Sequence, residues 1–419
     1  MHIVMVHRGM FPERIGGTYS YIYELGRRLA KRGHAVDVIA STRLSEVDSV
    51  DEFEGMTVHR YAFRRANPVF STLQHLKHTE RLFREIHRRQ PVDVLSIHES
   101  QLGYRLAVGP LGRSICQAPT FHAPVFLEFR LNTAWKVAAE PSAMKRAWMR
   151  ATRPPLEHWQ RKFENGVLDV ANGIVVLSKY SREHIEREFP SVDTGKVTIV
   201  PGGVDTKRFR PADDVRAVRE RLGLDDGAVH LLTVRNLAPR MGLENLVRAM
   251  PAVAASAAER GERVLLTICG GGALHDTLVE LCRELGVADE VRLAGRVSDE
   301  DLTRYYQAAD LFVLPTEAME GFGISTVEAL STNRPVVGTP AGATPEILES
   351  IEGCIVSRDT SASAISDAVV EWLQRPDRRE PTTRYRDTVL AKYDWERVTD
   401  ALEAYYQEQA RAFAEQNGH

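Results

Sequence analysis

Short apolar runs alternate with amphipathic stretches along the first half of the chain. HIVMVH opens as a β-rich run, YSYIYELGRRLAKRG follows Gly16-Gly17 with helical spacing, and AVDVIAS comes next as a second strand. This order predicts a βαβ unit. Similar runs recur at VDVLSI, APTFHA and GIVVLS. We therefore expect the first half to form a parallel sheet wrapped by helices.

The same alternation restarts at about residue 230. Helices are predicted from Leu243, Leu274, Asp299 and about Ser325, between the apolar runs HLLTVRN, VLLTICGGG, VRLAG, LFVLP and PVVGT. This pattern predicts a second doubly wound α/β domain.

Between the two series lies IVPGGVDTKRFRP, whose Pro and Gly content is typical of a linker. After about Tyr393, DWERVTDALEAYYQEQARAFAEQ has the spacing of a long amphipathic helix. We expect an N-terminal domain of residues 1–205, to which a helix over 394–419 returns, and a C-terminal domain of residues 206–393. A cleft is expected between the two domains, and the last helix is expected to cross their junction.

Residues 123–165 break the strand and helix rhythm and are interpreted as an inserted helical excursion, rich in basic and aromatic residues. Three roles stay open for it: covering an acceptor, touching lipid headgroups, or packing on the edge of its own domain.

Composition narrows the class of protein. No apolar run approaches the roughly 20 residues that span a bilayer, and the start lacks the order of a secretion signal, so a cytoplasmic protein is expected. The four scattered cysteines, without a CxxC pair, argue against a zinc site or a disulfide framework. Residues 1–200 carry a charge of +8 and the remainder −11. The positive half fits an anionic partner, a peripheral membrane contact or an ordinary solvated face. No nucleic-acid partner is expected, and the oligomeric state stays open.

The stretch EGFGISTVE contains the most informative spacing. Glu320 comes at the end of a predicted strand, Gly321-Phe322-Gly323 exposes backbone amides, and Glu328 falls inside the next predicted helix. Ligands of open α/β sheets gather at such strand ends, where helix N-termini favour anions. Two carboxylates beside an anion are costly unless they accept hydrogen bonds from neutral hydroxyls, which sugars and ribose supply.

EGFGISTVEAL followed by PVVGTPAGATPEIL resembles the signature of retaining glycosyltransferases of family 4, which have the GT-B architecture of two Rossmann-like domains. The resemblance covers nearly the whole chain, because IGGTYSYIYELGRRLAKRGHAVDVI, IVVLSKYSREHI, VPGGVDTKRFRP, LAGRVSDEDLTRYYQAADLFVLPT and YDWERV match in order. It implies a nucleotide diphosphate sugar as donor, with UDP and GDP both open.

The resemblance also implies roles for individual residues. Glu328 would bind the ribose hydroxyls, Glu320 would hold hydroxyls of the transferred sugar, and His122 would lie near the reacting centre. His98, which also ends a predicted strand, is equally well read as an acceptor contact or as packing. The other donor-binding positions are Gly16, Gly17, Arg235, Asn236, Gly270, Gly295, Arg296, Val297, Gly321, Phe322, Gly323 and Ile324.

The chain departs from the family in one loop. The family places an Arg and, five residues later, a Lys on the diphosphate, whereas this chain has Asn236 and Met241 there. Arg235 and Arg240 each lie one residue earlier with the same separation. Arg240 is favoured as the substitute and Arg235 comes second. The alternatives are weaker binding of the departing diphosphate, an unusual donor, or lost catalysis.

The mechanism that the resemblance implies retains the anomeric configuration and needs neither an enzymic nucleophile nor a metal or cofactor. Asp299-Glu300-Asp301 imitates a metal-binding DxD motif but is interpreted as the acidic first turn of a helix.

Several functions stay open at this point. The favoured acceptor is a small molecule, for example in antibiotic biosynthesis, and the alternative is a cell-envelope glycan or lipid. The glycines of ICGGGALHDTL superficially resemble a dinucleotide turn but lack the full GxGxxG of a Rossmann oxidoreductase. A GT-B epimerase or phosphorylase and a non-catalytic nucleotide-sugar binding protein are the remaining rivals.

Overall fold

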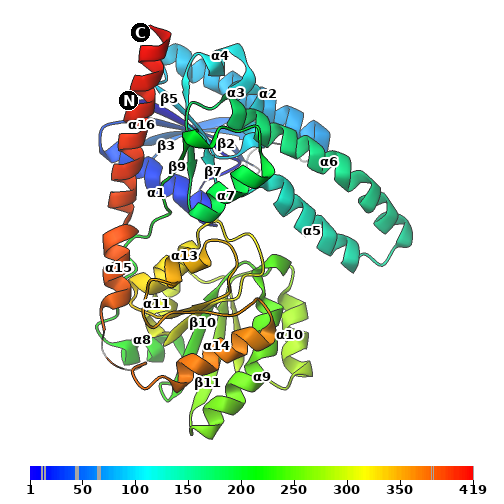
Figure 1. Ribbon diagram of the computed structural model, residues 1–419, viewed down its shortest axis with the longest axis vertical. Coiled ribbons are helices and arrows are strands. Elements are labelled where there is room, and N and C mark those ends of the chain that lie inside the picture. The colour runs from blue at the N-terminus through cyan, green and yellow to red at the C-terminus, as the bar shows by residue number, and fades with distance from the viewer. Residues whose placement is uncertain are drawn as a thin grey trace. The chain divides into compact units, whose positions relative to one another are not determined.

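The computed structural model describes residues 1–10, 13, 16–42, 47–63, 68–378, 380 and 382–418. The chain divides into two compact units (Figure 1). Unit 1 comprises Met1–Pro201 and Trp395–His419, and unit 2 comprises Gly202–Asp394.

Unit 1 holds two sheets. The larger has the order β3-β4-β2-β1-β5-β6 and is parallel except for β3, and the smaller has the order β7-β8-β9. The strands are β1 (His2–Val6), β2 (Ala35–Thr42), β3 (Ser49–Phe53), β4 (Met56–Ala62), β5 (Val94–Ile97), β6 (Cys116–Gln117), β7 (Thr120–Phe121), β8 (Ile174–Val176) and β9 (Val197–Ile199). The helices are α1 (Gly17–Lys31), α2 (Pro68–Arg89), α3 (Ser100–Val108), α4 (Pro110–Arg113), α5 (Val125–Ala139), α6 (Ala143–Val170), α7 (Lys179–Glu188), the 3₁₀ turn η1 (Thr194–Lys196) and α16 (Trp395–Asn417).

The prediction of one parallel sheet for this half was therefore wrong in detail. The runs APTFHA and GIVVLS supply β7 and β8 of the smaller sheet. The antiparallel β3-β4 hairpin was not predicted, because SVDEF is a largely exposed edge strand without the apolar content of the other strands. Glu54 and Gly55 close this hairpin with positive φ at both residues, as a two-residue hairpin turn requires.

The C-terminal helix α16 packs against α1 within unit 1. Arg32 joins the two helices through ion pairs with Glu396, Asp400 and Glu403 at 3.2, 2.8 and 2.8 Å. Buried Trp395 stacks edge-on against Tyr21, with 5.7 Å between the ring centroids. The last 25 residues of the chain thereby complete the first unit.

Unit 2 is a parallel six-stranded sheet with the order β12-β11-β10-β13-β14-β15 and helices on both faces (Figure 1), which confirms the predicted doubly wound sheet. Its strands are β10 (Ala228–Val234), β11 (Arg263–Cys269), β12 (Val291–Gly295), β13 (Leu311–Leu314), β14 (Val336–Gly338) and β15 (Ile355–Val356). Its helices are α8 (Val215–Leu222), the 3₁₀ turn η2 (Pro239–Met241), α9 (Leu243–Glu259), α10 (His275–Glu284), α11 (Asp299–Ala308), α12 (Ile324–Ser331), α13 (Thr344–Leu348), α14 (Ala362–Gln374) and α15 (Arg384–Lys392).

Each large sheet reverses its winding direction at one place. In unit 1 the reversal lies between β1 and β5, and in unit 2 between β10 and β13. Ligands of doubly wound sheets bind beyond the carboxyl ends of the strands at this switch point. The segments after β1, β5, β10 and β13 are therefore the places where a site is expected.

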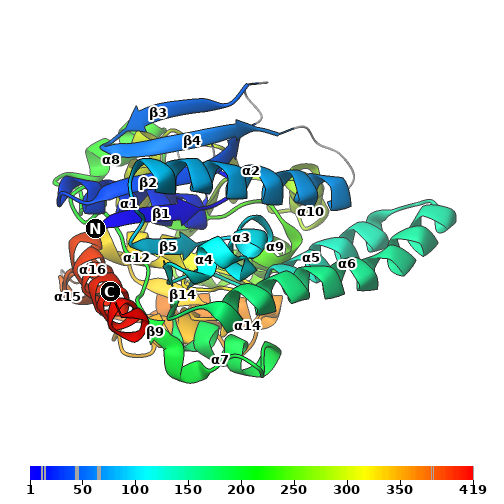
Figure 2. The ribbon, with the colours of Figure 1, turned by 90° about the horizontal axis from the view of Figure 1, so that it is seen from above.

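The predicted helical excursion is confirmed as two long helices, α5 and α6, which pack against each other. They project as a hairpin beyond the rest of unit 1 (Figures 1 and 2). Glu164, 1% exposed in the base of α6, accepts hydrogen bonds from the amides of Val125 (2.7 Å) and Phe126 (3.3 Å) at the start of α5. Pro124, the residue before α5, has no side-chain cap to offer. Glu164 takes the place of that cap.

Glu164→Ala is expected to destabilise unit 1 by about 2–3 kcal/mol, because the amides of Val125 and Phe126 lose their buried acceptor. Urea unfolding followed by circular dichroism measures this loss. Glu157→Ala on the same helix is the matched control. Its carboxylate pairs with the exposed Arg130, so the expected change is about 0.5 kcal/mol. Equal losses in the two variants would contradict the capping role of Glu164.

Candidate active site

Arg235 and Glu320 meet at the switch point of unit 2. Arg235 directly follows β10, and Thr316 and Glu320 lie in the segment after β13. The Arg235 guanidinium forms an ion pair with the Glu320 carboxylate and donates to the Thr316 hydroxyl. Thr316 also donates to Glu320 at 3.1 Å. The side chains of Arg235 and Glu320 are only 9% and 13% exposed, so the pair is well shielded from water.

The backbone around Glu320 is held in an uncommon conformation. Met319 has a φ of 63°, which is rare for a residue with a side chain and is often found at functional sites. The Arg240 guanidinium donates to the Met319 carbonyl at 3.3 Å, and the Arg240 carbonyl accepts from the Glu317 amide at 3.0 Å. Arg240 therefore supports the turn before Glu320, whereas Arg235 contacts the Glu320 carboxylate itself.

The first turn of α12 offers several polar groups to a ligand. Gly323 caps the helix with a φ of 99°, where a side chain would be strained, and no side-chain cap satisfies the first amides. Buried hydroxyl oxygens of Ser325 and Thr326 have no hydrogen-bond partner among the described residues. Unpaired donors at a helix N-terminus favour an anion.

Phe322 has a structural role beside its predicted backbone contact. Its side chain is 5% exposed and packs edge-on against Tyr393, with 5.5 Å between ring centroids. A Cβ atom at Gly202 would lie 2.4 Å from the Phe322 ring, so glycine is needed there. This packing anchors the loop that presents Gly321, Gly323 and Ile324.

Glu328 lies one turn into α12 and accepts a hydrogen bond from the Tyr306 hydroxyl at 2.7 Å. Burial raises the pKa of the Glu328 carboxyl to about 7, although the Tyr306 hydrogen bond and the charge of Arg208 act in the opposite direction. A carboxylate that is costly to ionise in the free protein is well suited to accept hydrogen bonds from an incoming ligand.

The loops after β11 and β12 meet in unit 2 as the sequence suggested. The Gly270 amide donates to the Gly295 carbonyl at 2.7 Å. The exposed Arg296 side chain lies over Gly271, where an added Cβ would be 3.0 Å from its Nε atom, and Val297 follows in the same loop. Asn236 is exposed next to Arg235. The structure thus gathers the predicted donor-binding residues of unit 2 around the carboxyl edge of one sheet.

Two histidines meet at the carboxyl edge of the strands of unit 1. His98 follows β5 and His122 follows β7, and their Nδ1 and Nε2 atoms lie 3.1 Å apart. His98 Nε2 lies 3.2 Å from the Ser96 hydroxyl, which accepts a hydrogen bond from Tyr406 of α16 at 2.9 Å. The Tyr21 ring meets His122 edge-on.

Burial lowers the pKa of both His98 and His122, and the neighbouring His7 lowers them further. Both rings are therefore neutral at physiological pH. Because Tyr406 donates to the Ser96 oxygen, the Ser96 hydroxyl can donate its own proton to His98 Nε2. His98 then carries its proton on Nδ1 and donates it to His122 Nε2. In that order of donors, His122 carries its proton on Nδ1.

Gly16 and Gly17 occupy the predicted turn at the start of α1. Gly16 precedes the helix with a φ of 149°, and the N-terminus of α1 has no side-chain cap. An uncapped helix N-terminus favours an anion, and the contact of Gly16 and Gly17 with the donor stays a prediction.

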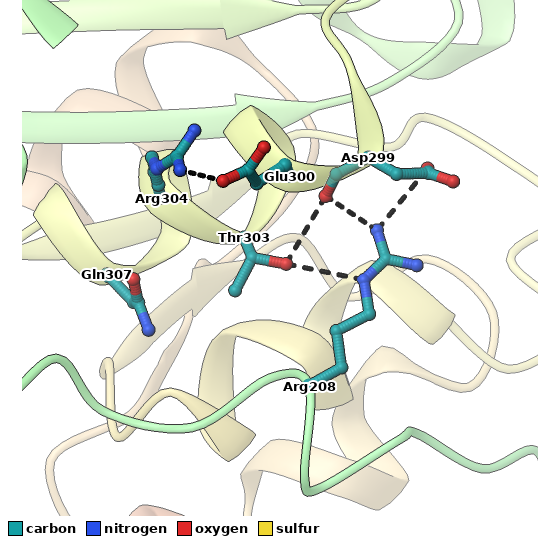
Figure 3. A pocket seen from close by; sticks show the side chains of 6 residues that line it. All are labelled: Arg208, Asp299, Glu300, Thr303, Arg304 and Gln307. Carbon is teal, nitrogen blue, oxygen red and sulfur yellow. Dashed lines mark hydrogen bonds and ion pairs between the residues drawn. The ribbon is translucent and has the colours of Figure 1, made fainter. Parts of the chain in front are cut away.

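A cavity of about 460 Å³ is lined by Arg208 and by residues of α11, namely Asp299, Glu300, Thr303, Arg304 and Gln307. Figure 3 shows that its charged side chains already contact one another: Arg208 reaches Asp299, and Arg304 reaches Glu300. Ser298 caps α11 by accepting from the Asp301 amide, and Asp299, Glu300 and Asp301 form its first turn, as predicted. Over the ranges that the structure describes, no three His, Cys, Asp or Glu side chains are arranged to hold a metal ion.

Sequence reasoning missed the partners that hold the predicted residues. Tyr306 binds Glu328, Thr316 binds Glu320, and Ser96 and Tyr406 lead to His98. Thr316 and Ser96 were detectable in principle because they lie close in sequence to Glu320 and His98, but Tyr306 and Tyr406 come from other segments of the chain.

Comparison with known families assigns the chain to one class. A model described as "Glycosyltransferase Family 4" matches residues 15–208, and one described as "Glycosyl transferases group 1" matches residues 214–387. Together they span most of the chain, and the chain belongs to this family of retaining glycosyltransferases. It is a glycosyltransferase with a nucleotide-sugar donor.

Curated relatives of nearly full length act on inositol-containing acceptors. The chain is 27% identical over 411 residues to a GDP-mannose-dependent alpha-(1-6)-phosphatidylinositol monomannoside mannosyltransferase of Mycobacterium tuberculosis, covering 96% of this chain and 97% of that protein. It is 28% identical over 414 residues to a D-inositol 3-phosphate glycosyltransferase of Geodermatophilus obscurus, covering 95% and 86%.

Solved structures share the fold. Sucrose-phosphate synthase of Thermosynechococcus elongatus superimposes with a TM-score of 0.79 at 20% identity, covering 98% of this chain and 99% of that one. WaaG, a glycosyltransferase involved in lipopolysaccharide biosynthesis, gives 0.69 at 16% identity, covering 95% and 99%. The predicted GT-B fold and family are thereby confirmed, and the Rossmann oxidoreductase reading is set aside.

Proposed function

We propose that this protein transfers a hexosyl group, with retention of configuration, from UDP- or GDP-sugar to a hydroxyl of a polyhydroxylated, phosphate-bearing acceptor. The observation that carries the donor half of this proposal is the α12 terminus. There, the uncapped amides and the unpaired Ser325 and Thr326 hydroxyls lie in the chain between Glu320, which precedes the helix, and Glu328, which is one turn into it.

The donor would bind with its diphosphate on the amides of Phe322, Gly323 and Ile324 and its ribose on Glu328. Glu320 would accept hydrogen bonds from the sugar hydroxyls. Of the two arginines, Arg235 is the better candidate to replace the Arg and Lys that the family places on the diphosphate. Its guanidinium contacts Glu320, and its buried Nε has no hydrogen-bond partner among the described residues. This reverses the preference for Arg240, whose guanidinium reaches a main-chain carbonyl.

In the reaction, the bond from the anomeric carbon to phosphate loosens first, and the acceptor hydroxyl enters from the same face. The departing phosphate oxygen takes the acceptor proton, and the enzyme orients both substrates and stabilises the leaving diphosphate. Neutral His122 would donate a hydrogen bond from Nδ1 to the donor sugar or the acceptor. This scheme asks for no metal, so turnover in the presence of EDTA is expected.

The acceptor class follows from the curated relatives. The two named above act on a phosphatidylinositol mannoside and on inositol 3-phosphate, which share a phosphorylated cyclitol. The positive charge of residues 1–200 suits such an anion. Neither relative supports the role in antibiotic biosynthesis that was expected from the sequence. A lipid-linked acceptor, as in the mycobacterial relative, is therefore included beside a free small molecule.

Incubation with UDP- and GDP-hexoses and either inositol 3-phosphate or phosphatidylinositol monomannoside tests the proposal. Mass spectrometry would detect the glycosylated product, and proton NMR would give its anomeric configuration. We expect one of the two donors and one of the two acceptors to react, with retention of the anomeric configuration. An inverted product would contradict the proposed mechanism.

Asn236 and Met241 favour a second candidate, a nucleotide-sugar binding protein without transferase activity. In that case, nucleoside diphosphates raise the melting temperature, but neither acceptor is glycosylated and the donors are not hydrolysed.

A further inference from the structure

The tip of the α5-α6 hairpin has its apolar face turned outward. Met144 and Trp148 are 83% and 67% exposed, among the most exposed large apolar residues of the described chain. Ala147 and Ala151 are exposed as well and lie at helical spacing from them. The four residues form one stripe along the first turns of α6, which we call the tip stripe.

On the first turns of α6, the side opposite the tip stripe is partly covered. Arg146, Met149, Thr152 and Arg153 are half-buried, whereas the tip stripe is open to solvent. An ordinary helix at a protein surface has the reverse arrangement, with its apolar side covered and its polar side exposed. A large exposed apolar group of this kind indicates an interaction surface.

Basic side chains flank the tip stripe. Residues 141–153 contain Lys145, Arg146, Arg150 and Arg153 and no acidic residue. Lys145 and Arg150 are exposed on either side of the stripe, about 100° of helical rotation away from its centre. Pro154 and Pro155 lie inside the helix, between this part and its well-packed base, where Phe163, Val167 and Leu168 are buried.

We propose that the tip stripe and its basic flanks dock this protein on the surface of an anionic lipid bilayer. A helix with an apolar stripe that bears a tryptophan and with lysine and arginine beside it lies in the plane of the membrane interface. The apolar side chains enter the headgroup boundary, and the basic side chains meet anionic headgroups. The hairpin projects from the rest of unit 1 (Figures 1 and 2).

A bilayer fits this surface better than a second copy of the chain. Two copies that met through the tip stripe would bring their basic flanks together without a carboxylate from residues 141–153 to balance them. Anionic headgroups supply that balance. The surface does not depend on the proposed reaction, because none of its residues belongs to the candidate active site.

Sedimentation of the full-length protein with lipid vesicles tests this docking. Vesicles of phosphatidylcholine alone are compared with vesicles that also contain phosphatidylglycerol. We expect binding to the anionic vesicles, a blue shift of the tryptophan fluorescence that is lost in Trp148→Phe, and a fall in affinity at high salt.

Two variants separate the two contributions. Met144→Ala/Trp148→Ala removes the apolar contact, and Lys145→Glu/Arg150→Glu reverses the flanking charge; each is expected to weaken binding about 10-fold or more. Arg248→Glu/Arg283→Glu is the matched control, because both side chains are exposed on unit 2 and the net charge changes equally. Circular dichroism shows whether each variant is folded.

Three results would overturn the docking. They are equal binding of wild-type protein to both kinds of vesicle, undiminished binding of Lys145→Glu/Arg150→Glu, and a dimer in solution that Met144→Ala/Trp148→Ala dissociates. The last result would assign the surface to a second copy. Sugar transfer to inositol 3-phosphate in the absence of vesicles is unaffected by the tip variants, so failure of the docking is distinguishable from failure of the proposed reaction.

Discussion

Replacement of Arg235 by alanine is expected to lower kcat by about 100-fold. The substitution leaves the shielded Glu320 carboxylate without its positive partner and removes a charge beside the proposed leaving diphosphate. Steady-state kinetics with the donor identified in the substrate screen measure this effect, and KM for the donor should change much less than kcat. Arg235→Lys should recover part of the loss, because it keeps the charge but not the planar fork.

Arg240→Ala is the control for this experiment. Arg240 donates to the Met319 carbonyl and so supports the turn before Glu320, and a loss of about 10-fold or less is expected. If kcat were little changed in Arg235→Ala but strongly lowered in Arg240→Ala, Arg240 would be the residue that stabilises the leaving diphosphate, as the sequence suggested.

Donor affinity is expected to fall by about 10-fold between pH 8 and pH 6. Burial raises the pKa of Glu328 to about 7 in the free protein, and the ribose hydroxyls are best accepted by the ionised carboxylate. Protons therefore compete with the donor in this range. Isothermal titration calorimetry with UDP or GDP across the range measures the dependence.

The stability of the free protein has the opposite dependence on pH. The folded-state pKa of Glu328 lies above the unfolded value of 4.5, so between these pH values the folded protein binds a proton that the unfolded chain releases. The contribution of Glu328 to the free energy of unfolding is therefore lost as pH rises from about 4.5 to 7. Glu328→Gln should remove both effects and weaken nucleotide binding.

Tyr306→Phe is the matched control, because the Tyr306 hydrogen bond lowers the pKa of Glu328 and its loss should move the midpoint upward. An unchanged profile in Glu328→Gln would exclude Glu328 from the ribose site.

The doubly wound sheet of unit 2 was predictable because its elements are local. Alternating apolar strands and amphipathic helices are recorded in neighbouring residues, and α9, α11 and α12 begin at or next to the predicted positions. The β3-β4 hairpin escaped prediction because a polar edge strand has no such pattern. The split of unit 1 into two sheets depends on strand pairing, which the pattern of single strands does not record.

The site could be predicted only in part. Glu320 and Glu328 were placed because strand ends and helix starts fix their surroundings. The Arg235–Glu320 pair was not foreseen, since it joins residues 85 positions apart through side-chain geometry. For the same reason, the sequence spacing could not distinguish Arg240, which was favoured, from Arg235, and the chain from Tyr406 through Ser96 to His98 became visible only in the fold.

The structure of a complex with a nucleoside diphosphate tests the central claim most directly. Crystals grown with UDP and with GDP should place the diphosphate on the amides of Phe322, Gly323 and Ile324, with the ribose hydroxyls on Glu328. A nucleotide bound elsewhere on unit 2, or a first turn of α12 that stays unliganded at saturating nucleotide, would contradict the account.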